Sequence, residues 1–139
     1  MFRTRVLISS LIERSLMNNA HLVHRWHVQD LPDASMTKGI DCAIMAFANS
    51  SNFVTDPGRD YIPFKPVADV RSMFSPETKV LIAIGGWGDT KGFSQGAANQ
   101  ASRELFAKNV AKILDTHGYD GVGKINNSRI TWTVAVKTC

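Results

Sequence analysis

Long apolar runs, clustered cysteines and the glycine patterns of nucleotide sites are all missing from this sequence. No apolar run approaches the roughly 20 residues that a membrane-spanning helix needs, so we expect no membrane span. The two cysteines, Cys42 and Cys139, have neither the spacing of a disulfide framework nor that of a zinc site. No Gly-x-Gly-x-x-Gly or Walker pattern is present, which argues against an unrelated doubly wound domain that binds a nucleotide. We expect neither a metal nor a cofactor.

A concentrated positive charge is also lacking, although the net charge is +4. Residues 1–27 and 123–139 are basic, whereas residues 28–122 hold more Asp and Glu than Lys and Arg. A nucleic-acid-binding domain would carry its cations on the folded part, so we expect no nucleic-acid partner. The run His21-x-x-His24-x-x-His27 does not predict a metal site, because this spacing does not keep three ligands on one helical face. Extracellular and cytoplasmic locations both stay open.

Two short apolar runs predict buried strands. Ile40 to Ala48 and Val80 to Ile84 are nearly continuous in apolar residues and are bounded by glycine or polar residues, as strands buried on both faces are. Residues 53–66 lie between them and are rich in proline and polar residues, which predicts a loop. Pro66 is expected at the first position of a short helix that ends before Pro76.

A longer helix is predicted from Ser102 to His117, because apolar residues recur there at the spacing of one helical face. Ser102 is expected to cap the start of this helix, and Gly118 its end. Tyr119 to Val122 then begins another strand. This alternation predicts an α/β fold with a parallel sheet covered by helices, in which ligands meet the C-terminal ends of the strands.

Three segments carry a resemblance to a known family: Gly39 to Ala48 (GIDCAIMAFA), Lys79 to Asp89 (KVLIAIGGWGD) and Tyr119 to Val122 (YDGV). In this order they resemble glycoside hydrolase family 18, the chitinase-like proteins, and within it the fungal branch. The resemblance implies the N-terminal half of a (β/α)8 TIM barrel, truncated within the fourth strand. It divides the chain into an unmatched N-terminal segment (1–25), a partial catalytic barrel (26–122) and a non-homologous tail (123–139).

The resemblance implies hydrolysis of β-1,4 links between N-acetylglucosamine units with retention, so chitin or N-acetylglucosamine oligomers are the partners of the full-length family. In that family the acetamido oxygen of the substrate is the nucleophile, and a Glu on the fourth strand donates the proton. The family writes this strand as Asp-Gly-x-Asp-x-Asp-x-Glu. Here Gly123, Ile125 and Asn127 stand where the later acids belong, and Asp120 is the one residue of the motif that is present. We therefore expect no hydrolysis by this chain.

The tail has its own interpretation, since residues 123–139 match no later part of the family and hold no Asp or Glu. Gly123-Lys124 can be coded GGT-AAG, which contains the intron donor sequence GTAAG, and the expected Asp codon also begins with G. We interpret the tail as a translated intron, with evolutionary loss of the acid as the alternative. A sheet that stops within its fourth strand would leave an open edge and uncovered apolar faces, so we expect poor stability. Residues 130–136 are expected to pair as a chance strand.

The expected substrate-binding residues are Gly85, Gly86 and Trp87, which follow the predicted strand that ends at Ile84. The glycines permit a tight turn, and Trp87 either stacks on a sugar ring or packs in the core. Asp89 is either a solvated loop acid or part of the cleft lining. The alternative to an inactive chitinase is a chitinase-like lectin that binds carbohydrate without hydrolysis.

Overall fold

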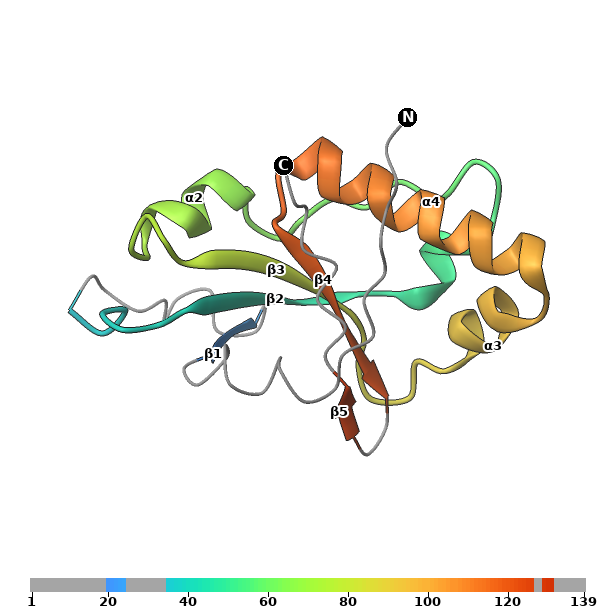
Figure 1. Ribbon diagram of the computed structural model, residues 1–139, viewed down its shortest axis with the longest axis horizontal. Helices are drawn as coiled ribbons and strands as arrows, with labels where there is room; N and C mark the ends of the chain where they lie inside the picture. Colours follow the sequence, from blue (N-terminus) through green and yellow to red (C-terminus); the bar gives the residue numbers. More distant parts are fainter. Residues whose placement is uncertain (1–19, 25–34, 127–128, 132–139) are drawn as a thin grey trace.

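The computed structural model describes residues 20–24, 35–126 and 129–131. Their strands form one sheet with the order β1-β2-β3-β4-β5 (Figure 1). The bounds are β1 (Ala20–His24), β2 (Cys42–Ala48), β3 (Lys79–Gly85), β4 (Gly121–Asn126) and β5 (Arg129–Thr131). Strands β1 to β4 are parallel, and each pairs with the next one along the chain. This is the arrangement of the first half of a (β/α)8 barrel, as the sequence predicted.

The two ends of the sheet come from segments that the sequence analysis had left outside the barrel. Strand β1 lies within residues 1–25 and pairs with β2 from Ala20–Cys42 to His24–Ala46. The end of β4 and all of β5 lie within residues 123–139, where Ile125 pairs with Ile130 in antiparallel register. Of the chance strand expected at residues 130–136, the structure describes residues 130–131, which lie in β5, and residues 132–139 lie outside the described residues.

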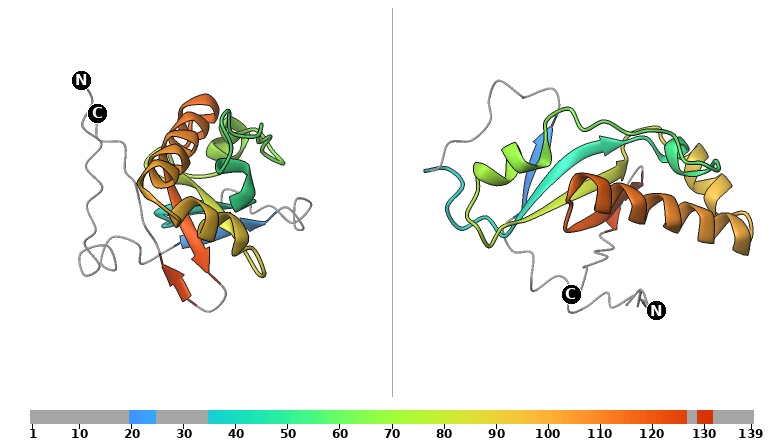
Figure 2. Two further views of the ribbon diagram at one scale, coloured as in Figure 1. Left: turned by 90° about the vertical axis from the view of Figure 1, so that its right-hand side faces the viewer. Right: turned by 90° about the horizontal axis from the view of Figure 1, so that it is seen from above.

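Helices cover one face of the sheet. Helices α2 and α4 both lie on this face in Figure 1, and Figure 2 shows α3 beside the start of α4. The bounds are η2 (Ser50–Phe53, a 3-10 helix), α2 (Val67–Ser72), α3 (Lys91–Ala97) and α4 (Gln100–His117). The expected short helix is confirmed, but Pro66 is not its first residue: the helix begins at Val67, and Pro66 is the N-cap. Helices η2 and α3 were not predicted.

The start of α4 corrects one expectation, because Ser102 is not the N-cap. The helix begins at Gln100, and the side-chain oxygen of Asn99 accepts a hydrogen bond from the Ser102 amide at 2.9 Å. Asn99 precedes the helix in extended conformation, so its side chain reaches the free amides of the first turn. The expected cap at the other end is confirmed: Gly118 has a φ of 77° and its amide donates to the Leu114 carbonyl.

Both faces of the central strands are buried. Alternate residues of β2 and β3 pack with α2 and α4 in one cluster, which includes Ala43, Met45, Val80, Ile82, Val70, Ile113 and Leu114. The residues between them form a second cluster on the opposite face: Cys42, Ile44, Ala46, Leu81 and Ala83. None of these side chains is more than 8% exposed. The expectation that the apolar faces of these two strands would lie uncovered is therefore wrong.

Candidate functional site

The C-terminal ends of β2 and β3 lie together at one edge of the sheet, because the two strands are parallel and adjacent. The 3-10 helix η2 follows β2 there, and a turn followed by α3 continues from β3, at the right of Figure 1. In parallel sheets covered by helices, ligand sites form at this edge. Gly85, Gly86 and Trp87 are all found here.

Residues 86–89 form a tight turn. The Asp89 amide donates a hydrogen bond to the Gly86 carbonyl at 3.4 Å. Gly88 has a φ of 81°, which the third residue of a type II turn requires. Gly86 has a φ of 112°, and a Cβ built on it would lie only 3.2 Å from the Phe47 ring. Glycine is therefore needed at the first and third positions of this turn, and Trp87 occupies the second.

The Trp87 side chain is 89% exposed. The alternative that it packs in the core is therefore wrong. Gly86, the preceding residue, is buried against the Phe47 ring, and Trp87 is the first exposed residue of the turn. An exposed aromatic ring beside the ligand edge of a parallel sheet has the chemistry to stack on the apolar face of a sugar.

Asp89 joins the turn to the neighbouring strand end. One carboxylate oxygen accepts a hydrogen bond from the Ser50 amide at 2.6 Å, and the other accepts from the Ser50 hydroxyl. Ser50 is fully buried at the start of η2. Gly92, in the first turn of α3, lies so close to Ser50 that a Cβ on it would overlap the Ser50 backbone. Asp89 is thus not a solvated loop acid, because its carboxylate is held by Ser50.

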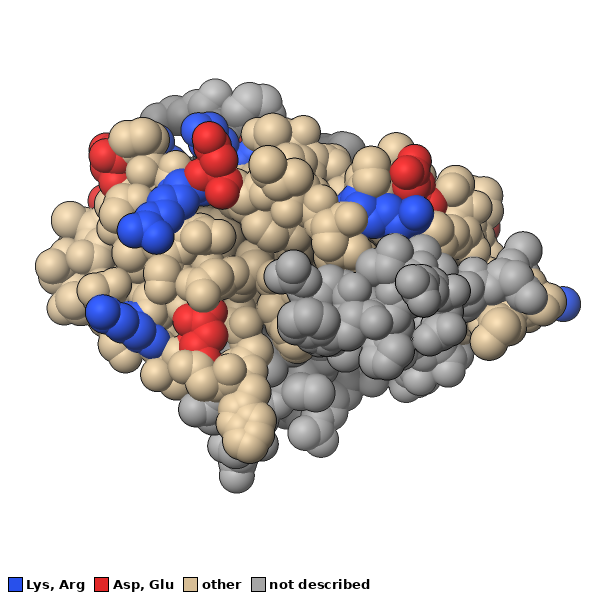
Figure 3. Space-filling model, turned by 180° about the vertical axis from the view of Figure 1, so that it is seen from behind, with Lys and Arg blue, Asp and Glu red and all other residues tan. Residues whose placement is uncertain are grey.

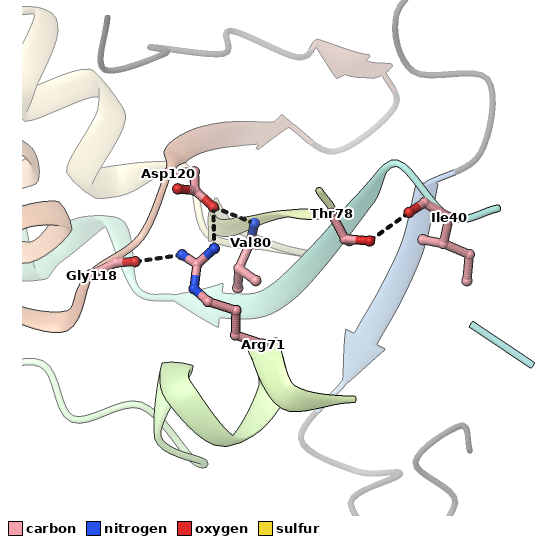
Figure 4. A network of polar contacts seen from close by, with 6 residues as sticks. All are labelled: Ile40, Arg71, Thr78, Val80, Gly118 and Asp120. Atoms are coloured by element: carbon pink, nitrogen blue, oxygen red, sulfur yellow. Dashed lines mark hydrogen bonds and ion pairs between the residues drawn. The ribbon is translucent and has the colours of Figure 1, made fainter. Parts of the chain in front are cut away.

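Asp120 lies at the opposite, N-terminal end of the sheet, immediately before β4 (Figure 4). Its carboxylate accepts hydrogen bonds from the Arg71 guanidinium and the Val80 amide, each at 2.8 Å. Arg71 also donates to the Gly118 carbonyl at 2.8 Å. The Asp120 side chain therefore joins α2 and β3 to the start of β4. With about 3.3 Å of rise per residue, Asn126 at the far end of β4 is roughly 20 Å away.

The surroundings of Asp120 favour its ionised form. Partial burial would raise the pKa of this carboxyl, but the hydrogen bonds from Arg71 and Val80 act in the opposite direction. The positive charges of Arg71 and Lys79 add to them. The net result is a pKa below the ordinary value of an Asp side chain. The residue is consequently an anion bound to a cation and an amide, and not a proton donor.

Strand β4 carries no acid at its C-terminal end. Gly123 is a buried residue within the strand, Ile125 follows two residues later, and Asn127 lies outside the described residues. Across the described part of the chain, no three His, Cys, Asp or Glu side chains gather in a way that could hold a metal ion. Nor is any helix of that part long and apolar enough to cross a membrane.

A hollow lies between residues 52–62 and α4. Its volume is about 280 Å³, and its lining includes Phe53, Tyr61, Asn109, Lys112 and His117. The buried Asn109 side chain donates to the carbonyls of Phe53 and Thr55, both at 2.9 Å, and so fixes the loop on the helix.

The back of the molecule shows Lys and Arg interspersed with Asp and Glu (Figure 3). The sequence analysis did not single out Ser50, Arg71 or Asn109, whose partners are 39 to 56 residues away along the chain.

Comparison with known proteins gives a consistent result. The family model for glycosyl hydrolases family 18 matches residues 20–123. The oviduct-specific glycoprotein of Sus scrofa is 33% identical over 82 residues, which are 57% of this chain and 16% of that protein. A family 18 chitinase from Cycas revoluta, solved with allosamidin, superposes with a TM-score of 0.59 at 18% identity, over 78% of this chain and 34% of its own. Human YKL-39, a pseudo-chitinase with retained chitooligosaccharide binding properties, gives a TM-score of 0.53 at 20% identity, over 78% and 32%.

The lengths of these matches agree with a chain that forms half of a barrel. The chain spans about a third of the solved relatives, 34% and 32% of their lengths, and these similarities show the same half-barrel arrangement of strands. The family match begins at β1, which the sequence analysis had left unassigned, and ends at Gly123, where the acidic motif breaks off. The match covers more than half of the residues, and the chain belongs to glycosyl hydrolases family 18.

Proposed function

We propose that this chain binds β-1,4-linked N-acetylglucosamine oligomers at the C-terminal edge of β2 and β3 without cleaving them. The observation that carries the proposal is the 89% exposed Trp87, held at the tip of a tight turn at the ligand edge of the sheet. Gly85 and Gly86 are buried, and the absence of a side chain on Gly86 lets the turn that presents Trp87 lie against the Phe47 ring. The chitooligosaccharide binding retained by the pseudo-chitinase YKL-39 supports binding without hydrolysis as a function within this fold.

The absence of cleavage follows from the residues at the end of β4. Protonation of the leaving oxygen requires a carboxylic acid near the scissile bond. Gly123, Ile125 and Asn127 have no ionisable side chain, and residues 123–139 hold no Asp or Glu. Asp120 is ionised by its partners at the other end of the strand, so it does not replace the missing acid.

The test combines a binding and a hydrolysis assay on the purified chain. Chitotetraose binding is measured by calorimetry for the parent chain, for Trp87→Ala, and for Ile62→Ala as a control, because Ile62 is an apolar residue outside the turn that is 83% exposed. We expect Trp87→Ala to weaken binding about tenfold, the effect of one lost stacking contact, and Ile62→Ala to leave it unchanged. Release of reducing ends should match buffer. Equal affinity of the parent chain and Trp87→Ala would refute the site, and turnover above buffer would refute the absence of cleavage.

We also propose a hydrolytic function for a longer product of the same gene, of the fungal chitinase type. The family match ends at Gly123, the residue at which the acidic motif departs from the family pattern. A transcript that restores Asp at this position and continues through Asp-x-Asp-x-Glu would supply the acid and the remaining strands. Such a protein would cleave chitin oligomers by substrate-assisted retention.

A further inference from the structure

The turn that carries Trp87 is fixed at both of its ends. At the first residue, Gly86 is buried against the Phe47 ring, with space for little more than its hydrogen atoms. At the last residue, the Asp89 carboxylate accepts two hydrogen bonds from Ser50, one from the amide and one from the hydroxyl. We call Ser50, Asp89 and Gly92 the brace. These contacts anchor the turn to residues on both sides of the C-terminal end of β2.

The hydrogen bonds of the brace are expected to be stronger than hydrogen bonds at the protein surface. Ser50 is 0% exposed, so its amide and hydroxyl have no competing water, and Asp89 is half-buried. A carboxylate that accepts from an amide and a hydroxyl makes charge-assisted hydrogen bonds, which are shorter and stronger than neutral ones. Gly92 then brings the start of α3 into direct contact with the Ser50 backbone. The brace therefore ties the strand end, the turn and the helix into one unit.

Trp87 cannot be positioned by packing, because 89% of its side chain is exposed. The backbone of the turn is the remaining means of holding the ring, and the brace fixes that backbone two residues after Trp87. A ring held in place before a ligand arrives loses less freedom on binding than a mobile one. We infer that Asp89 is a positioning residue, which acts through Ser50 to hold Trp87 ready for stacking on the sugar oligomer. This inference rests on the proposed function for its ligand.

A purely structural role for Asp89 would predict a different outcome from a positioning role. Loss of a structural contact would lower the unfolding temperature and leave the motion of Trp87 in the folded chain unchanged. Loss of a positioning contact would increase the motion of the Trp87 ring. The fluorescence anisotropy of that ring distinguishes the two, because it reports rotation on the nanosecond scale of loop motion.

The experiment uses the full chain with Trp26→Phe and Trp132→Phe, which leaves Trp87 as the single emitter of the three tryptophans. In this background we compare Asp89→Ala, Asp89→Asn and Ser50→Ala. Asp69→Ala is the control, because it removes an exposed acid of α2 at the opposite end of the sheet. Anisotropy is measured without ligand, affinity is measured with chitotetraose, and circular dichroism verifies that each variant is folded.

We expect Asp89→Ala to lower the Trp87 anisotropy and to raise the Kd for chitotetraose about two- to tenfold, the range for freezing one mobile side chain on binding. Asp89→Asn keeps an acceptor oxygen, and Ser50→Ala keeps the amide donor, so both should lie between the parent chain and Asp89→Ala. Asp69→Ala should match the parent chain. If Asp89→Ala does not fold, Asp89→Asn and Ser50→Ala provide the same comparison.

The two measurements separate this inference from the proposed function. Unchanged anisotropy in folded Asp89 and Ser50 variants would overturn the positioning role, whatever the affinity. Reduced anisotropy with a raised Kd would support it. Reduced anisotropy in a chain that does not bind chitotetraose at all would support the brace as the element that holds Trp87, and would refute the proposed function instead.

Discussion

Replacement of Asp120 separates the two contacts that this side chain makes. Asp120→Ala removes the ion pair with Arg71 and leaves the amide of the fully buried Val80 without its acceptor. The ion pair is partly screened by water, since the two side chains are 36% and 30% exposed, so it contributes about 1 kcal/mol or less. The unpaired buried amide costs about 1–3 kcal/mol. We therefore expect Asp120→Ala to lower the free energy of unfolding by about 1–4 kcal/mol.

Asp120→Asn is the matched variant, because it keeps an oxygen for the Val80 amide and loses only the charge. Its cost should be about 1 kcal/mol or less. Arg71→Ala should cost slightly more, since the Gly118 carbonyl also loses its donor. Urea titration followed by circular dichroism gives the three values, and hydrogen exchange of the Val80 amide reports the local bond. Equal losses for Asp120→Ala and Asp120→Asn, or an unchanged exchange rate in Asp120→Ala, would refute the assigned role of the Val80 contact.

Three further predictions concern the pH dependence of the Asp120 contribution, the reactivity of Cys42, and the codons of Gly123 and Lys124. The difference in unfolding free energy between the parent chain and Asp120→Asn should be full above about pH 4 and should decline below it, because the pKa of Asp120 is lowered in the folded chain and its contribution is lost as the carboxylate is protonated. A difference that stays constant from pH 2 to 7 in urea titrations would contradict the ion pair. In a Cys139→Ser chain, Cys42 should react with a disulfide reagent only after urea unfolds the protein, since the thiol is buried and burial raises its pKa. Rapid reaction without urea would show that the second cluster, on the face opposite the helices, is open to solvent. Genomic sequencing should give GGT-AAG for the codons of Gly123 and Lys124, and any other codons would remove the support for a retained intron.

The sequence predicted the parts of the fold that depend on local pattern. The strands β2 and β3 were predicted from short continuous apolar runs, and α4 from the helical spacing of its apolar residues; both signals lie within one short stretch of sequence. Strand β1 was missed because Ala20–His24 (AHLVH) is only five residues long, shows neither a continuous apolar run nor a regular alternation, and pairs with a strand about 20 residues later. Asn99 and Ser102 are both N-cap residue types, and only the structure decides between them.

The candidate site depends more on distant contacts, and less of it could be predicted. Gly86 and Trp87 were singled out by their position after a predicted strand. Helix α3 was missed because Gly92 and Gly96 are poor helix formers, and the structure shows that each lies against a neighbour, Ser50 or Phe106, too closely for a Cβ. The contact between Ser50 and Asp89 joins residues 39 positions apart, and no local pattern in either segment indicates it.

The antiparallel pairing of β5 with β4 bears on attempts to rebuild a whole barrel from two pieces. In a closed barrel the free edge of the fourth strand receives the fifth strand in parallel orientation. Here that edge is taken by residues of the same chain in the reverse direction, from Lys124–Thr131 to Asn126–Arg129. A separately produced second half would first have to displace this strand, in competition with a segment tethered only a few residues away, whose effective concentration is in the millimolar range. Reconstitution in trans is therefore disfavoured unless β5 is deleted.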